Sequence, residues 1–127
     1  MRDSQNLEAT TETLKYALGV LEADVHRNAY EHGWWNNEAG DYDVDSRNRT
    51  ECVALAMTEL AEAIEARRKG SPSDEHCPDF SNEEVELADC VIRILDYSAA
   101  FDLDVVGAML AKHEFNKSRP YRHGKQF

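Results

Sequence analysis

The sequence lacks long apolar runs and is poor in basic residues, and both features argue against particular classes of function. No stretch approaches the roughly 18 consecutive apolar residues of a membrane span, and the N-terminal segment MRDSQNLEAT has no apolar signal-peptide core. Fourteen Lys and Arg against 25 Asp and Glu give a formal charge of -11, which opposes binding to nucleic acid or an anionic membrane. We expect a cytoplasmic protein without such partners, and a metal-dependent protein is the better candidate.

Cysteine is scarce as well. Cys52, Cys77 and Cys90 are odd in number and lack a CxxC or Cys/His ligand spacing. This favours reduced thiols over a disulfide framework and argues against a zinc site.

Alternating strand patterns are absent too, and the 3.6-residue period of helices dominates. Gly33 and Gly70 are suited to helix ends, Ser81 and Glu84 have capping-box spacing, and Pro120 disfavours helix at the residue before it. The sequence therefore predicts one all-α domain over residues 1–127, a four-helix bundle. Its helices are expected at about residues 6–32, at about 50–69, from the cap at Ser81 to about 100, and from 102 or 104 to 117.

Apolar residues define the faces of these helices. In the second, an inward stripe is expected at Val53, Met57, Leu60 and Ile64. The third carries two stripes, and a helix that is apolar most of the way round must be buried most of the way round. In so short a chain this predicts that a partner subunit covers one stripe, most simply in a homodimer. The stripes are Val85, Ala88, Ile92 and Leu95, and Leu87, Val91 and Ile94.

Two acidic pairs interrupt these helices, Glu59 and Glu62 in ELAE, and Glu86 and Asp89 in ELAD. Residues three apart share a helix face, so the four carboxylates can converge if the two helices pack antiparallel. Burying them unpaired would be costly, so a cation is expected between them. Oxygen ligands without His or Cys favour Mg²⁺ or Mn²⁺. The alternative is a solvated acidic helix face, which is common for a single pair.

The end of the chain, KHEFNKSRPYRHGKQF, is basic in an otherwise acidic protein. Lys112, Asn116 and Arg119 are spaced by four and three residues, along one edge of the last helix and its exit. Two cations and an amide are suited to binding phosphate oxygens. The alternative is a solvated basic tail.

Trp34 and Trp35 open the long polar loop that follows the first helix. Tryptophan usually lies in a core or interface because its ring buries a large apolar area. In the functional interpretation, one of them stacks on a nucleobase while Asn36, Asn37 or Tyr121 contacts the edge of the base.

The ordered set ExxE, ExxD and KxxxNxxR on three successive helices resembles the MazG-like all-α nucleoside triphosphate pyrophosphohydrolases. The flanking segments GWW, MTELAEAIEARRKG, EEVELADCVIRILD and NKSRPYRHGKQF are similar to those of its short cellular and phage members. The resemblance extends from about Gly33 to the C-terminus. It implies a MazG-like bundle, completed by dimerisation, as a homodimer or a dimer of dimers.

The same resemblance implies an enzyme that converts a nucleoside triphosphate and water to the monophosphate and pyrophosphate. The four carboxylates would be catalytic and would hold one or two Mg²⁺, or Mn²⁺, which acidify a water that attacks the α-phosphorus. Glu59 or Glu62 could accept the proton of that water, and Glu65 or Glu83 could serve a second metal. Lys112, Asn116 and Arg119 would orient the phosphates.

Two other classes of helical protein are relevant. A di-iron carboxylate bundle needs Glu-x-x-His repeats, and no Glu or Asp in this sequence is followed by His three residues later. A non-catalytic helical dimer, acting as a regulatory or scaffold module, stays open as the alternative. Mg²⁺-dependent release of pyrophosphate would distinguish the enzyme from the scaffold.

Overall fold

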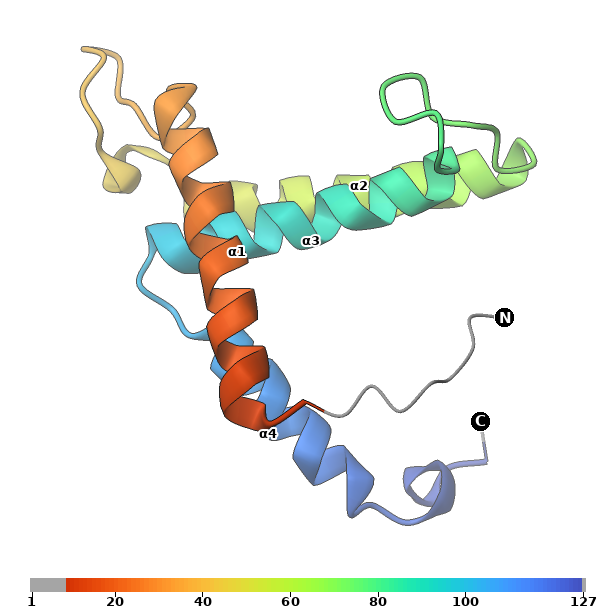
Figure 1. Ribbon diagram of the computed structural model, residues 1–127. Helices are drawn as coiled ribbons and strands as arrows, with labels where there is room; N and C mark the ends of the chain where they lie inside the picture. The colour runs from red at the N-terminus through yellow and green to blue at the C-terminus, as the bar shows by residue number, and fades with distance from the viewer. Residues whose placement is uncertain (1–8, 127) are drawn as a thin grey trace. The chain divides into compact units, whose positions relative to one another are not determined.

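The computed structural model describes residues 9–126 and is all-helical, as predicted. The four α-helices are α1 (Thr11–Glu31), α2 (Arg49–Arg68), α3 (Asn82–Ala100) and α4 (Val105–Lys117), with short 3₁₀ helices at Val44–Ser46 and Tyr121–Gly124 (Figure 1). Within this range there is no strand beyond two isolated bridges. None of the helices described is long and apolar enough to cross a membrane.

The chain divides into two compact units. The larger unit, Glu22–Leu103, holds the end of α1, the long polar loop, α2 and α3. Of the described residues, the smaller unit combines 9–21 with 104–126, and so holds the start of α1 and all of α4.

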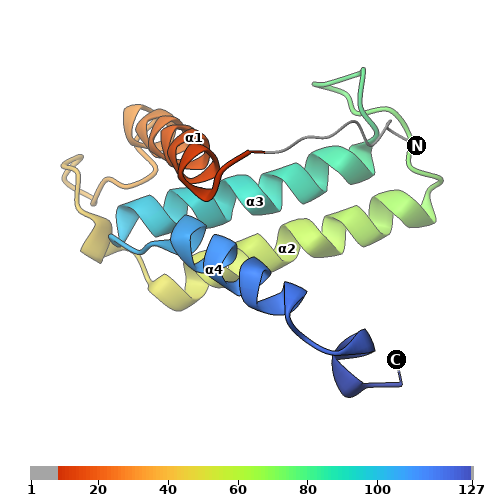
Figure 2. The same cartoon turned by 60° about the horizontal axis from the view of Figure 1, so that its bottom comes forward.

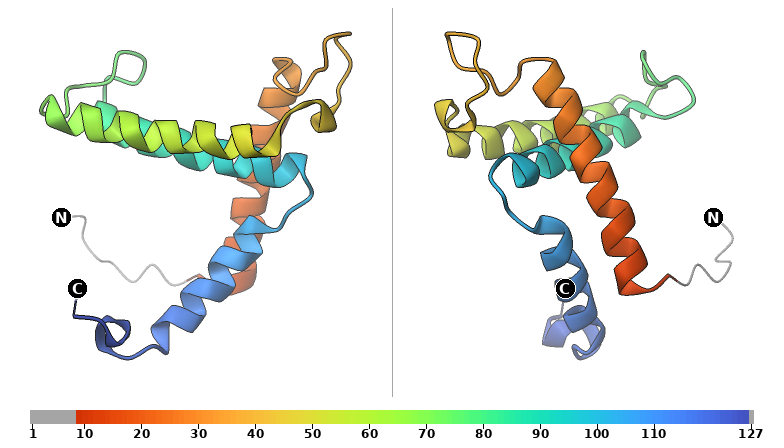
Figure 3. Two further views of the ribbon diagram at one scale, coloured as in Figure 1. Left: turned by 180° about the vertical axis from the view of Figure 1, so that it is seen from behind. Right: turned by 60° about the vertical axis from the view of Figure 1, so that its left-hand side comes forward.

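Helices α2 and α3 form an antiparallel pair in the larger unit. They run side by side in Figure 1, and the views of Figures 2 and 3 agree. The loop after α2 joins their adjacent ends, which allows a short connection between antiparallel neighbours. This confirms the packing on which convergence of the two acidic pairs depends.

The buried face of α2 differs from the predicted one. Val53, Met57, Leu60 and Ile64 are between 45 and 65% exposed, so the expectation that they point inward is wrong for the single chain. Helix α2 instead buries a stripe of mostly small residues with one glutamate among them, and small side chains allow close approach to α3. The buried stripe is Cys52, Ala56, Glu59, Ala63 and Ala66.

Side-chain caps define where the helices begin. Asn48 and Asp104 accept backbone N–H bonds at the starts of α2 and α4, and Ser81 and Glu84 form the predicted capping box of α3. After α2, Gly70 adopts a positive φ of 85°, the conformation that favours glycine just past a helix.

Helix α1 begins later than the expected position near Asn6, which itself lies outside the described residues. The hydroxyl of Thr10 accepts a hydrogen bond from the N–H of Thr13 at 3.1 Å, so Thr10 caps the helix that begins at Thr11. The three cysteines are free thiols, as expected, with Cys52 and Cys90 buried and Cys77 exposed.

Candidate functional site

Three of the four predicted carboxylates converge between α2 and α3. Glu59, Glu62 and Glu86 each offer a carboxylate oxygen, and these oxygens lie within 4.8 Å of one another. Glu59 is buried, Glu86 is half-buried and Glu62 is exposed, so the group opens to solvent on one side. We call these three residues the carboxylate cluster.

Asp89 lies outside this cluster, so the predicted convergence of all four carboxylates is shown for three. Asp89 is one helical turn after Glu86 and is half-buried. Burial, followed by the negative charge of Glu59, raises the pKa of Asp89, whereas the charge of Arg93 lowers it. Asp89 is therefore electrostatically coupled to the cluster.

The carboxylate cluster holds its negative charge unequally. Burial, a hydrogen bond with Glu59 and the negative charge of Glu62 raise the pKa of Glu86 to about 7. Burial also acts to raise the pKa of Glu59, but hydrogen bonding to Arg93 and Glu62 and the charge of Arg93 hold that pKa below its ordinary value. Glu59 therefore favours its ionised form, whereas burial and the neighbouring carboxylates disfavour the ionised form of Glu86.

The raised pKa of Glu86 predicts that the metal-free protein loses stability as pH rises. Unfolded glutamate has the ordinary pKa of 4.5, so between that pH and about 7 the folded chain binds more protons than the unfolded chain. The free energy of unfolding should then fall by about 1 to 2 kcal/mol across this window, allowing for partial exposure of Glu86. The lowered pKa of Glu59 makes the free energy of unfolding depend on pH only below about pH 4.5, outside this window.

Urea unfolding in EDTA at about pH 5 and pH 8 measures this fall. The variant Glu86→Gln should show a smaller one because it cannot titrate at this position. Equal falls in parent and variant would show that Glu86 is not the responsible group.

Arg93 is a site residue that the sequence analysis did not identify. Its Nε donates a hydrogen bond to Oε1 of Glu59 at 2.6 Å, and the Arg93 and Glu59 side chains are 43% and 8% exposed. A signal was available, because Glu86, Asp89 and Arg93 are spaced by three and four residues and share one face of α3. A basic residue on an acidic helix face indicates an ion pair or a ligand contact.

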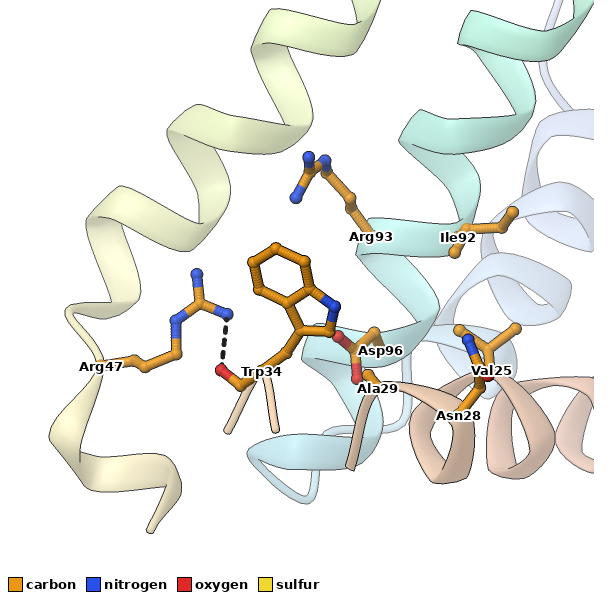
Figure 4. A pocket seen from close by; sticks show the side chains of 8 residues that line it. All are labelled: Val25, Asn28, Ala29, Trp34, Arg47, Ile92, Arg93 and Asp96. Carbon is orange, nitrogen blue, oxygen red and sulfur yellow. Dashed lines mark hydrogen bonds between the residues drawn. The ribbon is translucent and has the colours of Figure 1, made fainter. Parts of the chain in front are cut away.

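A cavity of about 230 Å³ lies beside Arg93 in the larger unit (Figure 4). Trp34, predicted to contact a base, lines it and is 66% exposed. Trp35 is only 1% exposed and belongs to the core, so of the two tryptophans Trp34 is the one that solvent reaches. The lining residues are Val25, Asn28, Ala29, Trp34, Arg47, Ile92, Arg93 and Asp96.

A hydrogen-bonded network, also missed from the sequence, fixes one wall of this cavity. Asp96 accepts bonds from Trp35 Nε1 at 2.9 and 3.1 Å, and its Oδ1 lies 2.7 Å from Nδ1 of His26. Nε2 of His26 lies 3.1 Å from the hydroxyl of Tyr42. The network joins α1, the long loop and α3, and it satisfies both oxygens of Asp96.

The predicted phosphate-binding residues gather at the end of α4 in the smaller unit. Lys112 Nζ and Arg119 Cζ lie 4.7 and 5.9 Å from the centre of the Phe115 ring, so both cations surround one side chain. Oδ1 of Asn116 is buried without a hydrogen-bond partner in the described part of the chain. Tyr121 is 85% exposed. We call Lys112, Asn116 and Arg119 the basic edge.

No protein-family model matches the chain, and neither a curated protein nor a solved structure matches it. The function of this chain is therefore inferred from its own residues.

Proposed function

We propose that the protein is a Mg²⁺-dependent nucleoside triphosphate pyrophosphohydrolase of the MazG-like type. It would convert a ribo- or deoxynucleoside triphosphate and water to the monophosphate and pyrophosphate. The observation that carries the proposal is the carboxylate cluster on the antiparallel pair α2 and α3, whose three oxygens lie within 4.8 Å of one another. Arg93 neutralises only Glu59, and burial, a hydrogen bond with Glu59 and the charge of Glu62 raise the pKa of Glu86 to about 7.

The donor set fits a hard divalent cation. Only carboxylate oxygens meet in the cluster, and such ligands favour Mg²⁺ or Mn²⁺ over zinc, which prefers nitrogen and sulfur. When bound, Mg²⁺ would neutralise phosphate charge and make the attacking water more acidic. Glu59, Glu62 and Glu86 would hold it, with Asp89 as a further ligand.

Members of the carboxylate cluster and residues outside it would have different roles in the reaction. Because its pKa is held low, Glu59 stays ionised and can bind a cation at neutral pH. Glu62, the exposed member of the carboxylate cluster, is the better placed of the two to accept a proton from water. The basic edge would orient the phosphates and stabilise charge on the leaving pyrophosphate. Trp34, exposed beside the cavity, would stack on the base.

The decisive experiment supplies each nucleoside triphosphate in turn, with and without Mg²⁺, and measures pyrophosphate. Run in ¹⁸O-labelled water, attack at the α-phosphorus places the label in the monophosphate and leaves pyrophosphate unlabelled. Orthophosphate as first product, or label in pyrophosphate, would contradict the mechanism. Absence of any Mg²⁺-dependent product would favour the alternative, a non-catalytic regulatory or scaffold dimer.

Assembly is a separate part of the proposal. Leu87, Val91 and Ile94 of α3, one of the two stripes that could meet a partner, are 45, 54 and 39% exposed in the single chain. Burying such residues in an isologous homodimer, or a dimer of dimers, would remove a large apolar surface from water.

Sedimentation at micromolar concentration should therefore show a dimer or tetramer. Val91→Glu should shift the equilibrium from the oligomer toward the monomer, because the interface would bury an unpaired charge. Val91→Ala, which keeps the surface apolar, is the control and should stay assembled. A stable parental monomer would refute this part of the proposal.

A further inference from the structure

Arg93 belongs to two sites at once. Its Nε donates to Glu59 of the carboxylate cluster at 2.6 Å, and the same side chain lines the cavity of about 230 Å³. Arg93 also borders a second cavity of about 20 Å³, large enough for one water molecule. Figure 4 shows its side chain extending from α3 toward α2. At 43% exposed, the guanidinium has room to move.

The guanidinium and a divalent cation compete for the same carboxylate. Glu59 is the buried member of the cluster, and its Oε1 accepts the bond from Arg93. A carboxylate oxygen that is neutralised in this way is a weaker metal ligand. Metal binding and the ion pair must then oppose each other, and the effect is reciprocal by thermodynamic linkage.

The cavity lining includes one carboxylate, that of Asp96, and a bound ligand would give Arg93 a further acceptor. Both oxygens of Asp96 are already bonded, to Trp35 and His26. The charged residues of the lining are two cations, Arg47 and Arg93, and one anion, Asp96, so release of Arg93 from Glu59 would leave the lining with net positive charge. An exposed tryptophan face and two guanidinium groups suit a nucleotide. The volume is below the roughly 300 Å³ of a drug-sized site, so the cavity would take part of one.

We propose that Arg93 exchanges partners. Without a divalent cation it neutralises Glu59; when a cation takes that carboxylate, the guanidinium turns into the cavity and donates to a phosphate oxygen of the nucleotide. This inference rests on the proposed function and adds a coupling to it. The metal makes Arg93 available, so the nucleotide binds tightly only after the metal.

The test uses the full chain and Mn²⁺ alone, titrated by electron paramagnetic resonance without nucleotide. Arg93→Met, which keeps the aliphatic stem, should bind Mn²⁺ about three- to tenfold more tightly than the parent because the competing cation is gone. Calorimetry with the α,β-methylene analogues of the four common deoxynucleoside triphosphates, in Mn²⁺, should show about tenfold weaker binding. The partner exchange therefore predicts that Arg93→Met binds Mn²⁺ more tightly and the nucleotide analogues more weakly than the parent does.

Two further variants control the result. Arg27→Ala removes the same charge from an exposed arginine of α1, which pairs with Asp24 outside the proposed metal site, and both affinities should stay parental. Arg93→Lys keeps the charge and should lie between parent and Arg93→Met, and it replaces Arg93→Met if circular dichroism shows that variant unfolded.

Each outcome decides between the proposals. Weaker or unchanged Mn²⁺ binding by Arg93→Met, when the parent binds Mn²⁺, overturns the partner exchange and leaves the proposed function standing. A parent that binds no Mn²⁺ overturns both. Tighter Mn²⁺ binding in Arg27→Ala as well would show that the gain reflects net charge alone, and this also overturns the exchange.

Discussion

Glu86→Gln should lower the rate of pyrophosphate release by roughly 10² to 10³-fold while leaving the metal-free protein at least as stable as the parent. The rate falls because a ligand charge is removed where charge develops in the transition state. Stability is kept because Glu86, whose pKa is raised to about 7, is repelled by Glu59 and Glu62, and neutralising it relieves that repulsion.

Glu59→Gln should lose activity to a similar extent but behave differently in stability. Glu59 is ionised and paired with Arg93, whose charge helps to hold its pKa low. The variant leaves Arg93 without its carboxylate, and unfolding should become easier by about 1 kcal/mol, a modest figure because Arg93 is 43% exposed. The two variants thus share a catalytic effect and differ in stability.

The control is Glu51→Gln, an exposed glutamate in the first turn of the same helix, α2. It removes the same charge away from the cluster and should change the helix by only a few tenths of a kcal/mol. Near-parental activity in Glu86→Gln, with pyrophosphate release measured in saturating Mg²⁺, would refute the assignment of the carboxylate cluster as catalytic.

Helix period and end signals were enough to predict the frame of the site. Glu59 and Glu62 are three residues apart, as are Glu86 and Asp89 on the next helix. Each pair is therefore predicted to share one helix face, because the period of a helix is fixed. The loop between α2 and α3 favours antiparallel packing, and the structure confirms that the three glutamates meet. The capping box at Ser81 was also predicted correctly, because it depends only on residues close together in the sequence.

Packing faces were harder to predict because two helix faces of α2 are apolar. The larger side chains, including Met57 and Ile64, suggest the inward face, yet the stripe of Ala56, Ala63 and Ala66 is the buried one. Close approach of two helix backbones favours small residues at the contact. This effect depends on tertiary packing, so the hydrophobicity of the residues does not predict which face of α2 is buried.

Contacts between residues far apart in the sequence could not be predicted from helix periodicity. Arg93 with Glu59, and Asp96 with His26, join residues 34 and 70 positions apart, and each depends on the register of packed helices. Trp34 and Trp35 are adjacent in sequence, yet one is exposed and the other buried. Adjacent identical residues carry no signal that separates them, so the structure was needed to show which one solvent can reach.

Arg119→Ala should weaken triphosphate binding by roughly 10- to 100-fold while changing monophosphate binding little. In the proposed mechanism the basic edge binds the β- and γ-phosphates, which leave as pyrophosphate. Loss of hydrogen bonds from a charged guanidinium to phosphate costs about 1.5 to 3 kcal/mol. A monophosphate lacks the groups that Arg119 would contact, so the two ligands should respond differently.

The matched control is Arg122→Ala, which removes the same charge three residues later, where Arg122 is exposed and donates to the carbonyl of Gln126. Calorimetry with an α,β-methylene triphosphate and with the corresponding monophosphate, in Mg²⁺, gives the two affinities for each variant. Arg119→Lys should recover part of the loss, since lysine supplies the charge without the planar fork of arginine. Equal weakening of both ligands, or equal effects of Arg119→Ala and Arg122→Ala, would show that the basic edge attracts anions only through its net charge and does not bind the leaving pyrophosphate.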